Sequence, residues 1–281
     1  NNDSTAAKKE NKSDIYVKLT FYITYIFLVT TGTITFIEAL RTTNSKVRHI
    51  LNLETCISVV ATFFYTKFVK DIESDEKQGK PIDYKKINRE RYTDWMITTP
   101  IMLLVLCFAF VYNSKTSLNF FTYVIVLLLN FGMIVTGYLG EIGTYFSKMQ
   151  SLGLGFVFFF ALYGFLYYKF IHKQYNFDNI MLYLAFFVLW TFYGVVYMMD
   201  EVTKNVSFNI LDLLAKCFVG IFFWAYFTGV FKLKNKSVNW GTCPVLFRSF
   251  QGLRLDKSQM YACLREKVTM RHWDRHCLLC K

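Results

Sequence analysis

Seven long apolar runs follow one another along this chain of 281 residues. A bilayer core about 30 Å thick is crossed by about 20 apolar residues in a helix, and each run reaches or approaches that length. Charged residues make up only 19% of the chain, against about 25% in soluble domains. This pattern favours an all-α bundle of seven transmembrane helices over a globular protein with buried helices. The predicted spans are residues 15–40, 49–69, 92–112, 117–140, 150–171, 178–200 and 207–232.

The distribution of Lys and Arg between the loops predicts the orientation. The first loop carries Arg41, Lys46 and Arg48 without an acid, whereas bases and acids balance over residues 70–90. From Lys232 onward, 11 Lys and Arg stand against three acids, most of the net charge of +12. Because cytoplasmic loops are enriched in Lys and Arg, we expect an extracellular N-terminus and a cytoplasmic C-terminus. The basic charge then indicates contact with anionic lipid, and no nucleic acid is needed to explain it.

Three segments follow from this arrangement. Residues 1–14 form a polar extracellular segment, residues 15–232 the membrane domain, and residues 233–281 a basic cytoplasmic tail of unknown role. The tail contains Cys277-x-x-Cys280, a spacing typical of a pair of zinc ligands. A second matching pair is missing, so we predict no metal site.

Ionisable side chains inside the predicted spans point to function, because a charge in hydrocarbon is costly. Lys216 lies in the middle of the seventh span, with Asp212 one turn earlier on the same helix face. Asp94 and Arg91 share a face of the third span in the same way. Two interpretations fit Lys216 and Asp212: an ion pair that only holds helices together, or a reactive amine, since a lysine in apolar surroundings is suited to Schiff-base formation.

Three motifs surround these charges. Residues 91–100 read RYTDWMITTP, residues 190–193 read WTFY, and residues 212–216 read DLLAK. Together they resemble the microbial (type I) rhodopsins, and the chain looks most like the rhodopsins of giant marine viruses. The resemblance covers about residues 15–232.

This resemblance implies a light-absorbing membrane protein rather than an enzyme. All-trans retinal would be bound covalently to Lys216 as a protonated Schiff base. Asp94 matches the primary counterion and proton acceptor, and Asp212 matches the second counterion. Arg91 would balance the two carboxylates, and Thr98 would hydrogen-bond Asp94.

The resemblance also implies the residues of the retinal pocket. Trp95 and Trp190 would sandwich the polyene, and Tyr65 and Tyr193 would hydrogen-bond toward Asp212. The fifth helix aligns poorly, so none of its residues is assigned. A homo-oligomer is expected as well. The other expected pocket residues are Thr99, Met102, Asn130, Met133, Gly137, Tyr197 and Ala215, with Thr99 and Asn130 as an interhelical polar pair.

One position bears on the kind of transport. Outward proton pumps of the family carry a proton donor 11 residues after the acceptor on the third helix, about three turns away and therefore on the same face. Here that position is Val105, which cannot hold a proton. Acids on the second helix resemble those that line cation paths in channel-type rhodopsins. Glu54, Ser58 and Asn130 would line such a path.

We therefore expect a light-gated cation channel. The alternative is a light-driven outward proton pump that uses Glu54 or bulk water as its proton donor. A third, weaker interpretation is a photosensor, although no fused signalling domain is visible. Glu54 also fits a neutral buried acid without a transport role, and Glu38 beside Arg41 fits an interfacial salt bridge.

Overall fold

The computed structural model describes residues 2–172 and 176–228, with side chains from residue 14 onward. The predicted tail, residues 233–281, lies outside the described residues. The described part is helical, without strands. Its elements are α1 (Asn2–Arg41), α2 (Ser45–Lys77), α3 (Tyr84–Ser114), α4 (Phe120–Ile142), α5 (Lys148–Leu166), η1 (Tyr167–Ile171), α6 (Phe177–Val196), α7 (Glu201–Asp212), η2 (Leu213–Phe218) and α8 (Val219–Phe227).

Seven helical spans in the described residues are long and apolar enough to cross a membrane. The last of them, Glu201–Phe227, consists of α7, η2 and α8 in one continuous run. The predicted all-α fold with seven spans is confirmed.

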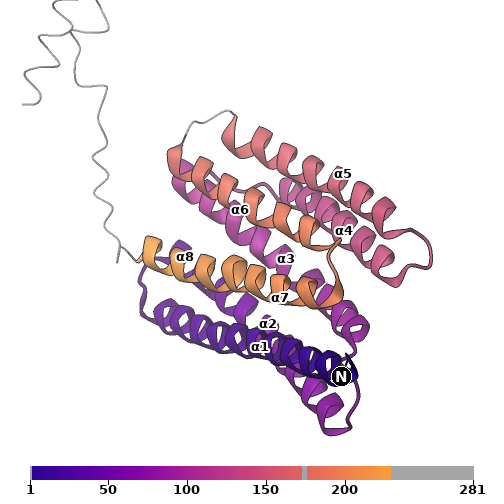
Figure 1. The fold of residues 1–281 in the computed structure, drawn as a ribbon. Helices are drawn as coiled ribbons and strands as arrows, with labels where there is room; N and C mark the ends of the chain where they lie inside the picture. The colour runs from indigo at the N-terminus through magenta and orange to yellow at the C-terminus, as the bar shows by residue number, and fades with distance from the viewer. Residues whose placement is uncertain (1, 173–175, 229–281) are drawn as a thin grey trace, which may run out of the picture. The chain divides into compact units, whose positions relative to one another are not determined.

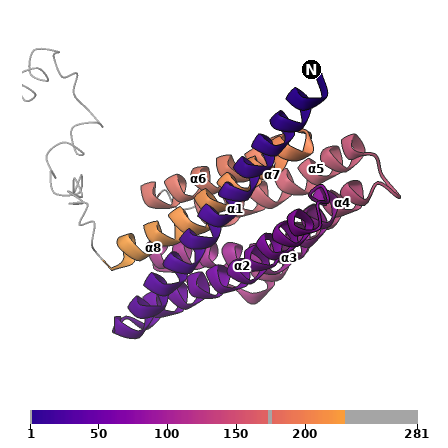
Figure 2. The ribbon, with the colours of Figure 1, turned by 60° about the horizontal axis from the view of Figure 1, so that its bottom comes forward.

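Each span packs against the next, and the seventh packs back onto α1. In Figure 1, α1 and α2 lie at one side of the bundle and α5 lies at the opposite side. Figure 2 shows that α7 and α8 form one continuous helical segment that lies beside α1. Helix α3 contacts α2, α4, α6 and α7, so it is the most central span and can present residues to several neighbours at once.

The helix ends differ from the predicted span ends. Residues 70–90 were expected to form a loop, but α2 continues to Lys77 and α3 already begins at Tyr84. Hydropathy marks the apolar thickness of the bilayer, not the length of the helix. Polar pairing supports the extra turns: Lys86 Nζ on α3 lies 2.9 Å from Asp71 Oδ2 on α2.

The first and sixth spans also end elsewhere than expected. Helix α1 begins at Asn2, so the predicted polar segment is part of the same helix. Helix α6 ends at Val196, short of the predicted residue 200. Asp200 is instead the N-cap of α7 and accepts a hydrogen bond from the Thr203 N–H at 3.0 Å. This bond lowers the pKa of the exposed Asp200 carboxyl, because it stabilises the charged form.

Candidate functional site

The seventh span widens around Lys216. Its α-helix gives way to the π-helix η2 over Leu213–Phe218 and resumes in α8. Short π segments inside α-helices occur often at functional sites. The residue pattern did not predict this segment. It carries the Lys216 side chain into the bundle, where only 1% of it is exposed.

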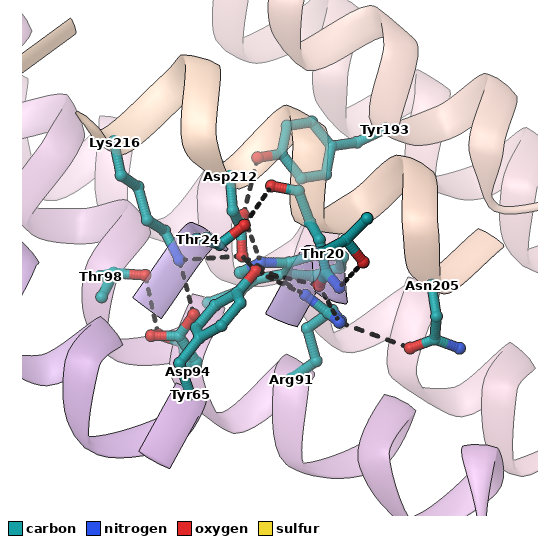
Figure 3. Close-up of polar contacts among 12 residues, drawn as sticks. Thr20, Thr24, Tyr65, Arg91, Asp94, Thr98, Tyr193, Asn205, Asp212 and Lys216 are labelled. Carbon is teal, nitrogen blue, oxygen red and sulfur yellow. Dashed lines mark hydrogen bonds and ion pairs between the residues drawn. The ribbon is translucent and has the colours of Figure 1, made fainter. Parts of the chain in front are cut away.

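Two carboxylates converge on the Lys216 amine (Figure 3). Lys216 Nζ lies 2.5 Å from Asp94 Oδ2 on α3 and 3.4 Å from Asp212 Oδ2 on α7. Neither carboxylate is exposed. A buried charge is costly unless it is paired, so the cation and the two anions stabilise one another. The structure thus places together the three residues expected to form the counterion complex.

The two carboxylates differ in their hydrogen bonds. Asp212 Oδ1 accepts from Tyr193 OH at 2.8 Å, and Asp212 Oδ2 accepts from Tyr65 OH at 2.9 Å. Asp94 Oδ2 contacts Lys216, but Asp94 Oδ1 is buried without a hydrogen-bond partner in the described residues. Asp212 is therefore held in place by donors, whereas Asp94 keeps an oxygen that is free to accept a proton.

Thr98 does not hold the Asp94 carboxylate. Its hydroxyl donates to the main-chain carbonyl oxygen of Asp94 at 2.9 Å. Threonines inside helices often bond the carbonyl four residues earlier in this way. Thr98 therefore hydrogen-bonds Asp94 as expected, but it bonds the main chain and does not orient the Asp94 carboxylate.

Arg91 lies on the side of Asp212 that faces the start of α7. Arg91 Nη1 is 3.4 Å from Asp212 Oδ2, and Arg91 Nη2 donates to Asn209 Oδ1 at 2.8 Å and Asn205 Oδ1 at 3.4 Å. The guanidinium carbon also lies 5.4 Å from the ring centroid of Phe21. The two asparagines were not predicted. Their spacing, i and i+4, with Asp212 three residues further, is a signal that could have identified them.

A cavity extends from Lys216 between α3, α4, α5 and α6. Three residues expected in the retinal pocket do not line it. Tyr65 is engaged with Asp212 instead, the Asn130 amide is engaged with Thr99, and Ala215 is buried within the π turn. The expected residues that do line it are Trp95, Thr99, Met102, Met133, Gly137, Trp190, Tyr193, Tyr197 and Lys216.

Helix α5 forms one wall of this cavity, which the sequence did not predict. The helix is apolar around its whole circumference, so no face could be singled out. It contributes Ser151, Leu152, Gly155, Phe156 and Phe159. Further unpredicted lining residues are Tyr92, Ile134, Gly194 and Phe208.

The cavity suits a long apolar group that ends at an amine. Its walls are mainly aromatic and aliphatic, and Lys216 and Asp212 supply the charged end. Two glycines let lining aromatic rings pack directly against the backbone: a Cβ on Gly194 would lie 2.6 Å from Phe156 Cζ, and a Cβ on Gly137 would lie 2.9 Å from Tyr92 OH. The residues present therefore fit a polyene bound through the lysine.

The expected ion-path residues are only partly brought together. Glu54 and Ser58 are buried one turn apart on α2. A Cβ on Gly220 of α8 would lie 3.0 Å from Glu54 Oε2, so the two helices approach closely there. The Asn130 amide is engaged elsewhere, because its Nδ2 donates to Thr99 Oγ1 of α3 at 2.9 Å.

Two further expectations concern the ends of the bundle and metals. Glu38 Oε2 lies 3.6 Å from Arg41 Nη1, which confirms the expected interfacial salt bridge. In residues 14–172 and 176–228 no group of three or more His, Cys, Asp or Glu side chains could hold a metal ion. Cys277 and Cys280 lie outside the described residues.

Comparison with known proteins gives consistent results. The family model described as "Bacteriorhodopsin-like protein" matches residues 17–230. A crystal structure of viral rhodopsin OLPVRII is 52% identical, with a TM-score of 0.70, and the match covers 76% of this chain and 99% of that one.

Other solved structures share the fold at low identity. Acetabularia rhodopsin I is 19% identical with a TM-score of 0.62, over 77% of this chain and 95% of that one. Blue light-absorbing proteorhodopsin from Med12 is 18% identical with a TM-score of 0.58, over 75% and 95%. Among curated proteins, none matches the sequence.

The family match covers most of the chain and all seven spans. Members of the family bind retinal through a lysine Schiff base, so retinal is the cofactor. The apolar spans make the chain an integral, multi-pass membrane protein. This chain belongs to the bacteriorhodopsin-like family of microbial rhodopsins.

Proposed function

We propose that this protein is a light-driven outward proton pump, with retinal bound at Lys216. Retinal held at Lys216 would supply the absorption of light and the isomerisation that provide the energy for transport. Asp94 accepts the proton held at Lys216 Nζ, and Asp212 stays ionised as the fixed counterion. The observation that carries this assignment is the 2.5 Å contact from Nζ to Asp94 Oδ2, together with an Asp94 Oδ1 that has no hydrogen-bond partner in the part of the chain that the structure describes.

Glu54 is the proposed donor that restores the proton at Lys216. Three acidic residues are buried in the described part of the chain: Glu54, Asp94 and Asp212. Asp94 and Asp212 are the counterions, which leaves Glu54. Glu54 makes no hydrogen bond or ion pair with the described residues. The usual donor position is Val105, which is buried and apolar. A carboxylic acid on the neighbouring helix supports reprotonation that valine cannot provide.

The direction of transport follows from the proposed orientation. The Lys and Arg of the first loop and of the tail favour an extracellular N-terminus and a cytoplasmic tail. The Arg91 end of the bundle then faces outward and the Glu54 end faces the cytoplasm. Within this scheme residues 15–232 form the retinal-binding domain, and the expected homo-oligomer stays a prediction.

A light-gated cation channel is the second candidate. Ser58 Oγ and Thr31 Oγ1 are buried beside Glu54 without hydrogen-bond partners in the described residues, so both can bind water. Ser58 also lines a groove between α1 and α2. The pump is favoured over the channel because the amide of Asn130, the third expected path residue, is hydrogen-bonded to Thr99 of α3 rather than to Glu54 or Ser58.

Voltage-clamped photocurrents in cells supplied with retinal separate the two functions. A pump gives a current that stays outward over a wide range of voltage and persists when a large organic cation replaces external sodium. A channel gives a current that reverses sign with voltage. A reversal that shifts with the cation gradient would overturn the pump.

A further inference from the structure

The cavity that begins at Lys216 extends to α5. This helix packs against α4 and α6, and in Figure 1 it lies at the opposite side of the bundle from α1 and α2. A molecule bound at Lys216 on the seventh span therefore points its free end toward α5. Four of the five α5 residues that line the cavity are glycine or apolar. The fifth, Ser151, is only 1% exposed, and its Oγ has no hydrogen-bond partner in the described residues.

A second hydroxyl lies beside Ser151. A Cβ on Gly140 of α4 would collide with both Ser151 Oγ and Tyr197 OH, so the two oxygens meet at the same glycine. Tyr197 also lines the cavity, and its hydroxyl donates to the main-chain oxygen of Gly137 at 3.2 Å. Because a hydroxyl oxygen has two lone pairs, Tyr197 OH can still accept a hydrogen bond. Ser151 and Tyr197 thus offer one free donor and one free acceptor at the α5 end of the cavity.

A hydroxyl group on an apolar molecule is the complement of these two groups. Its oxygen accepts from Ser151 Oγ, and its hydrogen is donated to Tyr197 OH. Plain retinal carries only carbon and hydrogen at its ring, and its single oxygen leaves as water when the aldehyde condenses with the Lys216 amine. Retinal alone would leave the Ser151 hydroxyl unpaired, which costs free energy in a buried site. A retinal with a hydroxyl on its ring satisfies both residues.

We propose that the α5 end of the cavity is a subsite for a ring hydroxyl, so that the protein binds a ring-hydroxylated retinal in preference to retinal itself. Ser151 and Tyr197 determine this preference, while Lys216 holds the other end of the molecule. The inference depends on retinal binding at Lys216, and not on the kind or direction of transport. Water is the rival partner for the same two hydroxyls, and competition between the two chromophores distinguishes it from a ring hydroxyl.

The competition uses the full-length apoprotein in lipid, prepared without retinal. All-trans-retinal is added in excess with an equal amount of all-trans-3-hydroxyretinal, and in a second series with all-trans-4-hydroxyretinal. Bound chromophores are released with hydroxylamine and quantified by chromatography. One net hydrogen bond corresponds to about a fivefold preference. We expect the wild type to take up one of the hydroxylated chromophores with that preference, and Ser151→Ala and Tyr197→Phe to lose most of it.

Thr136→Val is the matched control. Thr136 is a neighbouring hydroxyl on α4, since a Cβ on Gly155 would lie 3.6 Å from Thr136 Oγ1. Its hydroxyl already donates to the main-chain oxygens of Gly132 and Met133, at 2.9 and 2.8 Å. The preference should therefore persist in Thr136→Val, and an equal loss in this variant would contradict the assignment to Ser151.

Two other results overturn the subsite. Equal uptake of plain and hydroxylated retinal by the wild type would assign the Ser151 hydroxyl to water. A preference that persists in both Ser151→Ala and Tyr197→Phe would place its origin elsewhere, and if one variant fails to fold, the other still decides. Photocurrents of the same samples report on transport separately. A reversing current beside an intact preference contradicts the pump and leaves the subsite standing.

Discussion

The two halves of the bundle on either side of Lys216 are built differently. In the Arg91 half, defined by the polar chain from Asp212 through Arg91 to the buried pair Lys204 and Glu141, buried polar groups are linked by hydrogen bonds. In the Glu54 half, defined by the packing around Glu54 and Val105, α3 presents Val105, Leu106 and Cys107, which are all fully buried. Among the described residues, Glu54 has no hydrogen-bonded partner there.

This difference has a kinetic consequence. In the proposed pump, a proton leaving toward the Arg91 half meets polar groups that are already ordered by hydrogen bonds. A proton arriving through the Glu54 half must cross apolar packing, so water has to enter or helices have to move first. We expect proton uptake, not proton release, to limit the photocycle.

The largest expected effect is at Lys216, where both halves meet. Lys216→Ala removes the amine that forms the Schiff base, so the purified protein supplied with retinal should show no visible absorption band. Absorption spectroscopy checks this, with hydroxylamine-treated wild type as the reference for free chromophore. A visible band in Lys216→Ala would show that the chromophore is held elsewhere.

The next effect tests the Arg91 half. Asp94→Asn removes the proposed proton acceptor, and general acid–base groups typically contribute about 10²- to 10⁴-fold in rate. We expect light-driven acidification by vesicles or cells to fall by about two orders of magnitude or more. Thr98→Val is the neighbouring control and should change the rate little, because Thr98 bonds the main chain. Comparable losses in both variants would mean that the Asp94 carboxyl has no special role.

The Glu54 half is tested by moving the acid. Glu54→Gln should slow recovery of the resting state by about 10²-fold, since the proposed donor is removed. Adding Val105→Asp to this variant should restore part of the rate, because position 105 lies three turns from Asp94 on the same face. Flash photolysis measures both. Unchanged recovery in Glu54→Gln would exclude Glu54 as the donor.

The smallest effect concerns stability. Tyr65→Phe removes a buried hydrogen bond to Asp212, which should cost about 1–2 kcal/mol and lower the temperature of thermal bleaching. Tyr226→Phe removes a hydrogen bond to Asp178 at the opposite end, where the hydroxyl is only partly buried. We expect a smaller shift there, so a larger one would contradict the contrast between the halves.

The number of spans and the pairing of Asp212 with Lys216 could be predicted from local signals, whereas Asp94, on another helix, was assigned to the counterion complex only through the resemblance to the microbial rhodopsins. Apolar run length marks each span, and the spacing of Asp212 and Lys216 places them on one face. Lys204 was missed, since its partner Glu141 lies on another helix. The contribution of α5 to the cavity was missed because its apolar sequence does not distinguish one face.

The π turn over Leu213–Phe218 determines the direction in which the side chains of α8 point. Each residue advances an α-helix by about 100°, so the additional residue of a π turn rotates α8 by about that angle relative to an uninterrupted helix. Lys216 can thereby point at Asp94 while Gly220, one turn later, still meets Glu54. Shortening this segment by one residue would leave the composition of the helix almost unchanged. It would nevertheless break either the contact of Lys216 with Asp94 or the approach of Gly220 to Glu54. The length of the segment is therefore as strictly constrained here as the identity of its residues.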